Sequence, residues 1–229
     1  PLAYHPGTFW RYSFATDVCA RLVEVLSGLT FDDYLKDNIF NPLSMLDTDF
    51  YVPPEKLDRF TTMFLPDDPM NPMSPCPTPM DMPSTTSNGE LPTFLSGGGG
   101  LLSTLTDYLT FSRMVMAGGE WNNERIIEKQ TLDLMRTDQC PANVSVNFPM
   151  WSMPETGFGL GFALKGKPAE GEPQSAIGEY HWGGMAGTHF WWSPKANIAG
   201  ICMTQRMPGF WHPFSQAFKR HAYQIAAQQ

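Results

Sequence analysis

The sequence predicts an α+β fold, in which helices dominate the first two thirds and an antiparallel sheet with one closing helix follows. Two observations predict it. Apolar residues recur at helical spacing up to about residue 136, whereas the last third alternates apolar and polar residues in short runs that turn residues separate. A chain of 229 residues is long enough to bury a core of its own.

Two helices are predicted near the N-terminus. Thr16 or Asp17 is a suitable N-cap for the first, which ends at Ser27-Gly28. Its apolar residues form one stripe: Val18, Leu22, Val25 and Leu26. Thr30 and Asp33 form a capping start for the second helix, which Pro42 ends.

A long segment rich in proline and methionine, residues 65–96, interrupts the helical pattern. So many prolines leave no room for a regular element. A structureless loop of this length is either a functional lid or a linker. Its methionines and Phe94 supply apolar surface, which favours a functional lid rather than a bare linker.

The next segments return to helix. Gly97–Gly100 lacks the lysine and spacing of a phosphate loop, so its glycines indicate close backbone approach. A Thr-Leu-Thr-Asp sequence near Thr106 caps a third helix, which Gly118-Gly119 ends, and a short fourth helix is predicted near Lys129 to Arg136.

The last third reads as an antiparallel meander. Phe158–Leu164 alternates, Thr188–Ser193 and Ile198–Thr204 are strand runs, and Pro194–Asn197 is the turn between them. A closing helix starts at about Phe214. It carries one apolar face suited to lying on the sheet: Phe218, Ala222 and Ile225.

Composition excludes several classes of function. Lys plus Arg 15 against Asp plus Glu 23 gives a net charge of −8 with no basic run, so a nucleic-acid partner is not expected. No apolar stretch approaches the roughly 18 residues of a bilayer span, so we expect a soluble chain without membrane partners. The histidines lack metal-ligand spacing and no serine lies in G-x-S-x-G, so no metal, no cofactor and no α/β-hydrolase elbow is expected.

The cysteines predict structural thiols. Cys19 and Cys202 lie in apolar runs, where a small buried residue is usual. Free thiols mildly favour a reducing compartment, and therefore the cytoplasm.

Two short segments are candidates for chemistry. Tyr12-Ser13-Phe14 stands at a loop-to-helix start, and His181–Gly187 stands at the end of a predicted strand. Taken alone, each has a structural explanation that is the commoner one. A tyrosine before a helix usually packs as a staple, and glycine pairs on strands usually mark close packing.

Six motifs in order along the chain strengthen these candidates, because together they resemble the class C β-lactamase-like serine hydrolases, most closely the family VIII carboxylesterases. They are Pro6-Gly7-Thr8-x-x-x-Tyr12-Ser13, Ala15-Thr16-Asp17-Val18, Ile39-Phe40-x-Pro42-Leu43-x-Met45-x-Asp47-Thr48, Gly98-Gly99-Gly100-Leu101-x-Ser103-Thr104, Gly157-Phe158-Gly159-Leu160-Gly161-Phe162 and Trp182-Gly183-Gly184-x-Ala186-Gly187-Thr188-x-Phe190-Trp191. The resemblance implies a β-lactamase/transpeptidase-like fold whose N-terminal part is missing here. Residues 1–150 would form part of its helical subdomain and 151–229 the last strands and helix of its α/β subdomain.

The resemblance also implies site residues. In such enzymes a Ser of S-x-x-K attacks the acyl carbon, while its Lys and a Tyr handle the proton. Tyr12 matches that Tyr. The segment His181–Gly187 is similar to the H-K-T-G-S-T-G segment, which puts Trp182, Gly183 and Gly184 at the K-T-G positions. The backbone N–H of Met185 would then be an oxyanion donor.

Two departures from the pattern concern the substrate. Phe14 stands where penicillin-recognising relatives have Asn, and Trp182 replaces a cation that would attract a carboxylate. Both favour a small neutral ester as substrate. We expect an apolar, aromatic-lined acyl site that tolerates a range of short to medium chain lengths.

A third departure is the absence of S-x-x-K, since no Ser stands three residues before any Lys. The chain starts at Pro1 without an initiator Met or signal segment and reads as the middle of a longer protein. We expect an upstream segment or companion chain to supply the Ser and the Lys, and to pair with the far edge of the Ile198–Thr204 strand. The alternatives are a β-lactamase, peptidase or acyltransferase, and a non-catalytic binding relative.

Overall fold

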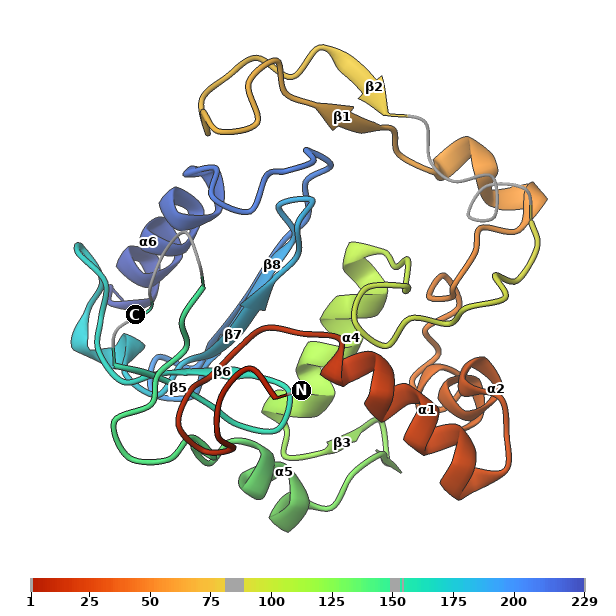
Figure 1. Ribbon diagram of the computed structural model, residues 1–229, viewed down its shortest axis with the longest axis horizontal. Helices are drawn as coiled ribbons and strands as arrows, with labels where there is room; N and C mark the ends of the chain where they lie inside the picture. Colours follow the sequence, from red (N-terminus) through yellow and green to blue (C-terminus); the bar gives the residue numbers. More distant parts are fainter. Residues whose placement is uncertain (1, 81–88, 149–152, 154, 229) are drawn as a thin grey trace.

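The structure is a computed structural model that describes residues 2–80, 89–148, 153 and 155–228 (Figure 1). Its centre is a five-stranded antiparallel sheet in which every strand pairs with the next one along the chain. The strands, in spatial order, are β5 (Thr156–Phe158), β6 (Ala163–Lys165), β7 (Tyr180–Gly183), β8 (His189–Ser193) and β9 (Ile198–Cys202). The predicted meander is therefore confirmed.

Within the sheet, the last strand ends at Cys202 rather than Thr204, and the largest difference from the prediction lies at Phe158–Leu164. Phe158–Leu164 is not a single strand, because the chain reverses at Gly161 (φ +103°) and runs back as β6. The backbone N–H of Gly159 donates to the carbonyl of Phe162 at 2.8 Å and closes this turn. Alternation continues through a tight turn, so the sequence pattern does not mark the reversal. The turn at Pro194–Asn197 lies where it was predicted.

Helix α1 spans Ala15–Ser27, close to the prediction, but its start is different. The N-cap is Phe14, which makes no side-chain capping bond, so the prediction of Thr16 or Asp17 as the cap is wrong. Asp17 lies in the first turn instead, where its carboxylate accepts from the Ser96 hydroxyl at 2.6 Å and from the Gly98 amide at 3.2 Å. The predicted close backbone approach of the glycine run is confirmed, since a side chain at residue 97 would meet α1.

The apolar stripe of α1 has an unexpected position. Val18, Leu22, Val25 and Leu26 are all exposed, and Ala20 is the only buried residue of the helix. The amphipathic pattern therefore forms the predicted helix, but no described residue covers the stripe.

The other helices start close to where the sequence places them. Helix α2 (Phe31–Leu35) runs into a π-helical turn, and its N-cap Thr30 accepts from the amide of Asp33 as predicted. Helix α4 (Leu105–Met116) is capped by Thr104, slightly earlier than expected. The last two are α5 (Lys129–Met135) and α6 (Phe214–Ala226).

Two small hairpins were not predicted. Strand β1 (Met63–Leu65) pairs with β2 (Thr78–Met80), so the expectation of no regular element within residues 65–96 is wrong; residues 81–88 of that segment lie outside the described ones. Proline is tolerated at Pro79 because a two-stranded ribbon has free edges. The second hairpin joins β3 (Glu120–Trp121) to β4 (Glu124–Arg125) through two asparagines with positive φ.

The sheet carries helices on both faces, with α4 on one side and α6 on the other (Figure 1). The main core joins the α4 face to the helical part of the chain: Leu35, Phe40, Leu43, Met45, Phe50, Met114, Val115, Leu132, Phe162, Tyr180 and Trp192. A smaller cluster under α6 contains Ala176, Trp191 and Tyr223. Within the described ranges, every helix falls short of the length and apolar character that a membrane crossing requires.

The face that α6 turns to the sheet matches the prediction only in part. The Phe218 ring contacts Trp191 with centroids 5.5 Å apart, and Ala222 packs against the cluster under α6. The buried residues of the helix are Ser215, Lys219 and Tyr223, whereas Phe218 and Ile225 are largely exposed. Cys19 is likewise exposed rather than buried, although Cys202 is buried and all four cysteines are free thiols. The division at residue 150 stays a prediction.

Candidate active site

The structure brings together residues from opposite ends of the chain. Tyr12, just before α1, stacks on Trp182 of β7 with ring centroids 6.0 Å apart and planes at 24°. Phe148 packs against both rings, at 5.8 Å from Tyr12 and 5.9 Å from Trp182. Tyr12 is half exposed. Two of the residues that the sequence singled out are therefore in direct contact.

Further aromatic rings enclose Trp182. Trp10 lies 6.1 Å from it and Phe158 of β5 lies 5.3 Å away in an edge contact. Phe210 extends the group through Phe148. We call these residues the aromatic cluster: Trp10, Tyr12, Phe148, Phe158, Trp182 and Phe210. The cluster offers an apolar surface of the kind that binds uncharged organic groups.

The turn from β7 to β8 holds the candidate oxyanion donor. The amide of Gly184 donates to the carbonyl of Thr188 at 2.7 Å, and the carbonyl of Met185 accepts from the amide of Gly209 at 2.8 Å. The amide of Met185 has no acceptor within the part of the chain that the structure describes. It is therefore available to a substrate oxygen.

The two glycines of this turn have a packing reason. A Cβ added at Gly183 would overlap the ring of His189, which lies directly across the sheet, and one at Gly184 would overlap the hydroxyl of Thr188. Close approach thus accounts for both glycines, and their role in substrate binding stays a prediction. Phe14 stands two residues after Tyr12, at the N-cap of α1, and is 82% exposed.

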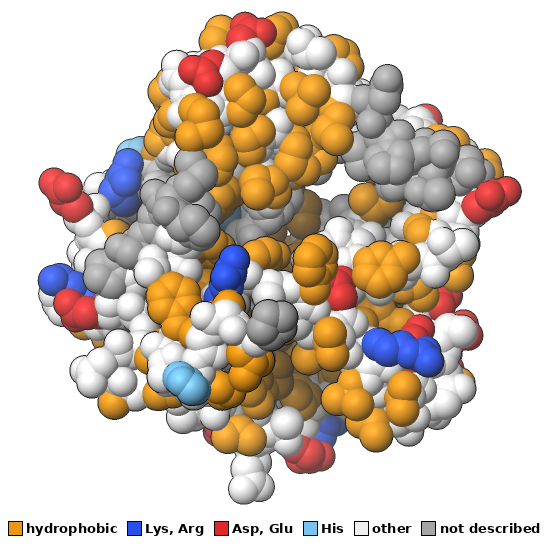
Figure 2. Space-filling view, viewed as in Figure 1, with side chains coloured by type: hydrophobic (Ala, Val, Ile, Leu, Met, Phe, Trp, Pro, Cys, Tyr) orange, Lys and Arg blue, Asp and Glu red, His pale blue; other side chains and the backbone are white. Residues whose placement is uncertain are grey.

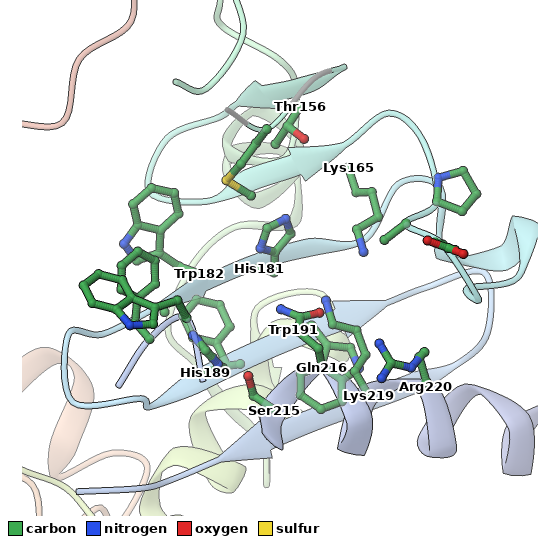
Figure 3. Close-up of a pocket in the computed structure, with 18 of the residues that line it drawn as sticks. Thr156, Lys165, His181, Trp182, His189, Trp191, Ser215, Gln216, Lys219 and Arg220 are labelled. Atoms are coloured by element: carbon green, nitrogen blue, oxygen red, sulfur yellow. The ribbon is translucent and has the colours of Figure 1, made fainter. Parts of the chain in front are cut away.

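A cavity of about 910 Å³ lies on the α6 side of the sheet (Figure 3). Trp182 and Gly183 contribute to its wall, whereas Tyr12, Gly184 and Met185 do not. Figure 3 shows Lys165 and His181 on the strands opposite Ser215 and Lys219 of α6. Because acyl transfer needs a proton-handling hydroxyl and an oxyanion donor, we place the reacting groups of the candidate active site at Tyr12, Trp182 and Met185. They adjoin the cavity where Trp182 lines it, so the cavity is the space next to these groups.

A buried ionic cluster borders the cavity. Glu179, fully buried, accepts from Lys219 and from the Tyr223 hydroxyl, both at 2.7 Å, and lies 3.2 Å from Lys165. Glu172 pairs with Lys165 at 2.6 Å. Two cations thus balance two carboxylates, as a buried charge requires. Burial lowers the pKa of Lys219, whereas for Lys165 the two carboxylates outweigh burial and raise the pKa.

Two histidines on neighbouring strands face this cluster. Burial, followed by the nearby charge of Lys219, lowers the pKa of His189 to about 4 and that of His181 well below its ordinary value. Both imidazoles are therefore neutral at pH 7. His181 Nε2, His189 Nδ1 and Ser215 Oγ have no hydrogen-bond partner among the described residues.

Sequence reasoning missed this cluster because its members are far apart in the chain. The strand alternation puts His181 and Lys165 on the face opposite Tyr180 and Leu164, but only the fold brings Lys219 to them. Among the described residues, no group of three His, Cys, Asp or Glu side chains is arranged to hold a metal ion.

An antiparallel five-stranded sheet with helices on both faces, joined to a helical part, defines the β-lactamase/transpeptidase-like fold of serine hydrolases. The chain belongs to the Beta-lactamase family, which matches residues 1–223. The family and the fold that the sequence motifs predict are therefore confirmed.

Curated relatives include an esterase. The chain is 30% identical to Protein Rv1367c of Mycobacterium tuberculosis over 224 residues, which cover 91% of this chain and 51% of that protein. It is 29% identical to Esterase EstB of Burkholderia gladioli over 212 residues, covering 86% and 49% respectively. The chain thus spans about half the length of these relatives.

Solved structures share the fold at lower identity. A simvastatin synthase (LovD6 mutant) from Aspergillus terreus superimposes with a TM-score of 0.82 at 23% identity, covering all of this chain and 58% of that one. EstCE1, described as a hydrolase with promiscuous acyltransferase activity, gives 0.77 at 22% identity, covering 96% and 57%.

Proposed function

We propose that these residues are the C-terminal portion of a serine carboxylesterase that hydrolyses neutral short to medium acyl esters. The observation that carries the proposal is the contact of Tyr12 with Trp182, beside a turn whose Met185 amide is free. The esterase among the curated relatives supports the same class of activity. The nucleophilic Ser and its Lys come from a segment outside residues 1–229.

The mechanism follows from these groups. The Ser oxygen attacks the ester carbonyl carbon, and its proton passes to the Tyr12 and Lys pair. The Met185 amide donates to the oxygen that becomes negative in the tetrahedral intermediate. The intermediate expels the alcohol, which takes the proton back, and leaves an acyl-enzyme. Water, deprotonated by the same pair, then attacks the acyl carbon. The second tetrahedral intermediate breaks its bond to the Ser oxygen, which takes the proton back, and the carboxylic acid is released.

The aromatic cluster supports a neutral substrate. Trp182 brings an apolar ring to the position next to the oxyanion turn, where a cation would be needed to hold a carboxylate. An apolar surface of this kind discriminates weakly between acyl lengths, at about 1–3 kcal/mol per methylene. We therefore expect broad specificity for short and medium chains.

Two measurements on the complete protein test the proposal. The first compares kcat/KM for p-nitrophenyl butyrate and for a cephalosporin, and we expect the ester to be far the better substrate. Equal or better turnover of the β-lactam would overturn the ester assignment in favour of a β-lactamase.

The second measurement locates the nucleophile. A fluorophosphonate phosphonylates an activated serine and releases fluoride, so peptide mapping identifies the modified residue. We expect the adduct on a Ser outside residues 1–229 that stands three residues before a Lys. An adduct on Ser13 or Ser215 would contradict the proposal.

A further inference from the structure

The segment 204–209, which follows β9, holds the turn that carries the candidate oxyanion donor. The Thr204 hydroxyl and the Arg206 backbone N–H both donate to the carbonyl of Ala186, at 2.9 and 3.2 Å. The Gly209 amide donates to the carbonyl of Met185 at 2.8 Å. Three bonds from one short segment therefore fix the carbonyls of Met185 and Ala186, directly after the Met185 amide.

The same segment also holds the β1–β2 hairpin. The Phe64 amide donates to the carbonyl of Gln205, and the Met207 amide donates back to Phe64, both at 2.8 Å. The guanidinium of Arg206 reaches the loop of the hairpin, where Nη1 donates to the carbonyl of Ser74 at 2.7 Å and Nη2 to that of Asn71 at 3.1 Å.

The hairpin loop is itself ordered around these two carbonyls. The Asp68 amide donates to the Ser74 hydroxyl and the Asp67 amide to the Pro75 carbonyl, each at 2.9 Å. Between them, Met70 and Pro72 contribute to the wall of the cavity that Trp182 also lines. Figure 2 shows apolar side chains gathered over the hairpin and a hollow beneath it.

We propose that Arg206 is a positioning residue that fixes the β1–β2 hairpin as one wall of the substrate site. Its backbone holds the oxyanion turn while its side chain holds the hairpin loop. The side chain donates to two neutral carbonyls at fixed positions. The planar guanidinium of arginine can reach both acceptors at once, whereas the single ammonium of lysine cannot. This inference rests on the proposed esterase function.

The side chain and the backbone of Arg206 hold different segments, so a substitution can remove the first contact and keep the second. Arg206→Gln removes the two bonds to the hairpin but keeps the backbone N–H that holds Ala186. The loop carrying Met70 and Pro72 should loosen, while the Met185 amide stays in place. Substrate contacts are then lost equally in the ground and transition states, so KM rises and kcat changes little. Because Met70 and Pro72 lie on the wall of a cavity, the rise in KM should be largest for esters with long acyl chains.

The experiment uses the complete protein as wild type, Arg206→Gln, Arg206→Lys and the control Arg125→Gln, which lies on the β3–β4 hairpin. Steady-state kinetics are measured with p-nitrophenyl acetate and octanoate. For Arg206→Gln we expect KM for the octanoate to rise roughly 5- to 30-fold, with less change for the acetate and kcat within about threefold. Arg206→Lys should be intermediate and Arg125→Gln unchanged.

Hydrogen exchange provides a readout that needs no activity. Amides of residues 67–75 should exchange about tenfold faster in Arg206→Gln, with residues 184–187 unchanged. Unchanged exchange at 67–75, or a KM that rises equally for both esters, overturns the role of Arg206. Absence of ester turnover in the wild type instead contradicts the proposed function, and the exchange of residues 67–75 then decides the anchoring role by itself.

Discussion

At the scale of single residues, Tyr12 is the group on which the proposed chemistry depends most. Its ring is fixed by Trp182 and Phe148, so Tyr12→Phe should leave the aromatic cluster intact and remove only the hydroxyl. We expect ester kcat to fall about 10²- to 10⁴-fold, the range for loss of a positioned acid–base group.

Stopped-flow or steady-state assays of the complete protein measure this loss. The matched control is Tyr4→Phe, because Tyr4 also packs on a neighbouring ring, that of Phe9, away from Trp182. Unchanged turnover in a folded Tyr12→Phe protein would mean that Tyr12 is a packing residue only.

Gly183 tests how tightly the oxyanion strand packs. An alanine Cβ at this position would overlap the His189 ring, so Gly183→Ala should destabilise the protein by about 1–3 kcal/mol, the usual effect of overpacking. Gly99→Ala is the control, since its Cβ would meet nothing within 4 Å. Thermal unfolding compares the two variants, and Gly183→Ala should have the lower Tm. An equal Tm for the two would show that the strand relaxes around the added methyl.

The neutral His189 predicts a pH dependence of stability. Its folded pKa of about 4 lies below the ordinary value of 6.5, so the unfolded state binds more protons between these values. Stability is therefore complete above pH 6.5 and is lost as the pH falls towards 4. From pH 7 to 5 we expect a loss of about 1–2 kcal/mol from this group.

Chemical denaturation of the complete protein at the two pH values measures this loss. Burial is the largest cause of the shift and the Lys219 cation the second. His189→Gln should therefore make the pH profile shallower by about this amount, whereas His181, whose pKa is also lowered, keeps its own contribution. The control His5→Gln, near the N-terminus, should leave the profile unchanged. A profile that is equally steep without His189 would assign the loss to other groups.

At the scale of elements, α6 is held to the sheet through charges. Glu179→Gln should leave Lys219 and Lys165 with one carboxylate between them and weaken the bond to Tyr223. Breaking a buried pair in this way costs about 3–5 kcal/mol. Asp133→Asn, in the exposed pair with Lys129, should have far less effect. Unfolding midpoints at pH 7 compare the two variants.

The same helix shows what the sequence could and could not predict. Its bounds follow from periodicity, and Phe214 is both the predicted and the observed start. Its buried face does not, because hydropathy ranks Phe218 and Ile225 above Ser215 and Lys219 as core residues. Only the tertiary structure reveals that the buried carboxylates of Glu179 and Glu172 pair with Lys219 on that face. Periodicity therefore locates elements more reliably than it orients them.

The candidate site was predictable in part. Motif order relates Tyr12 to Trp182, and their ring contact is the arrangement expected of a shared site. Phe148 and the segment 204–209 carry no motif, and they reach the site only through the register of the sheet and the turn after β9. Such contacts depend on long-range packing, which local patterns do not encode.

At the scale of the whole molecule, three surfaces of this chain are uncovered. The stripe of α1 is exposed from Val18 to Leu26, as Figure 2 shows in the apolar side chains over that helix. The second surface is the wall of the cavity on the other side of the sheet, to which Ser215 and His189 contribute. Their Oγ and Nδ1 atoms are buried and have no hydrogen-bond partner among the described residues. The third surface is the edge of β9, which pairs with β8 but with no other described strand.

We therefore predict that, in the complete protein, a strand from outside residues 1–229 pairs with the free edge of β9. An edge that is open and apolar is a template for aggregation, and a buried sheet satisfies the amides on both sides of each strand. Antiparallel pairing with β8 alone satisfies only alternate amides of Ile198–Cys202.

Hydrogen exchange of the complete protein, followed by NMR at single amides, tests this pairing. If a further strand lies beside β9, all its amides between Ile198 and Cys202 exchange slowly and together, because they open only with the sheet. If the edge is open, the amides that point away from β8 exchange orders of magnitude faster than their neighbours, and the prediction is wrong. The matched reference is β8, whose amides from His189 to Ser193 already have partners on both sides and should be slow in either case.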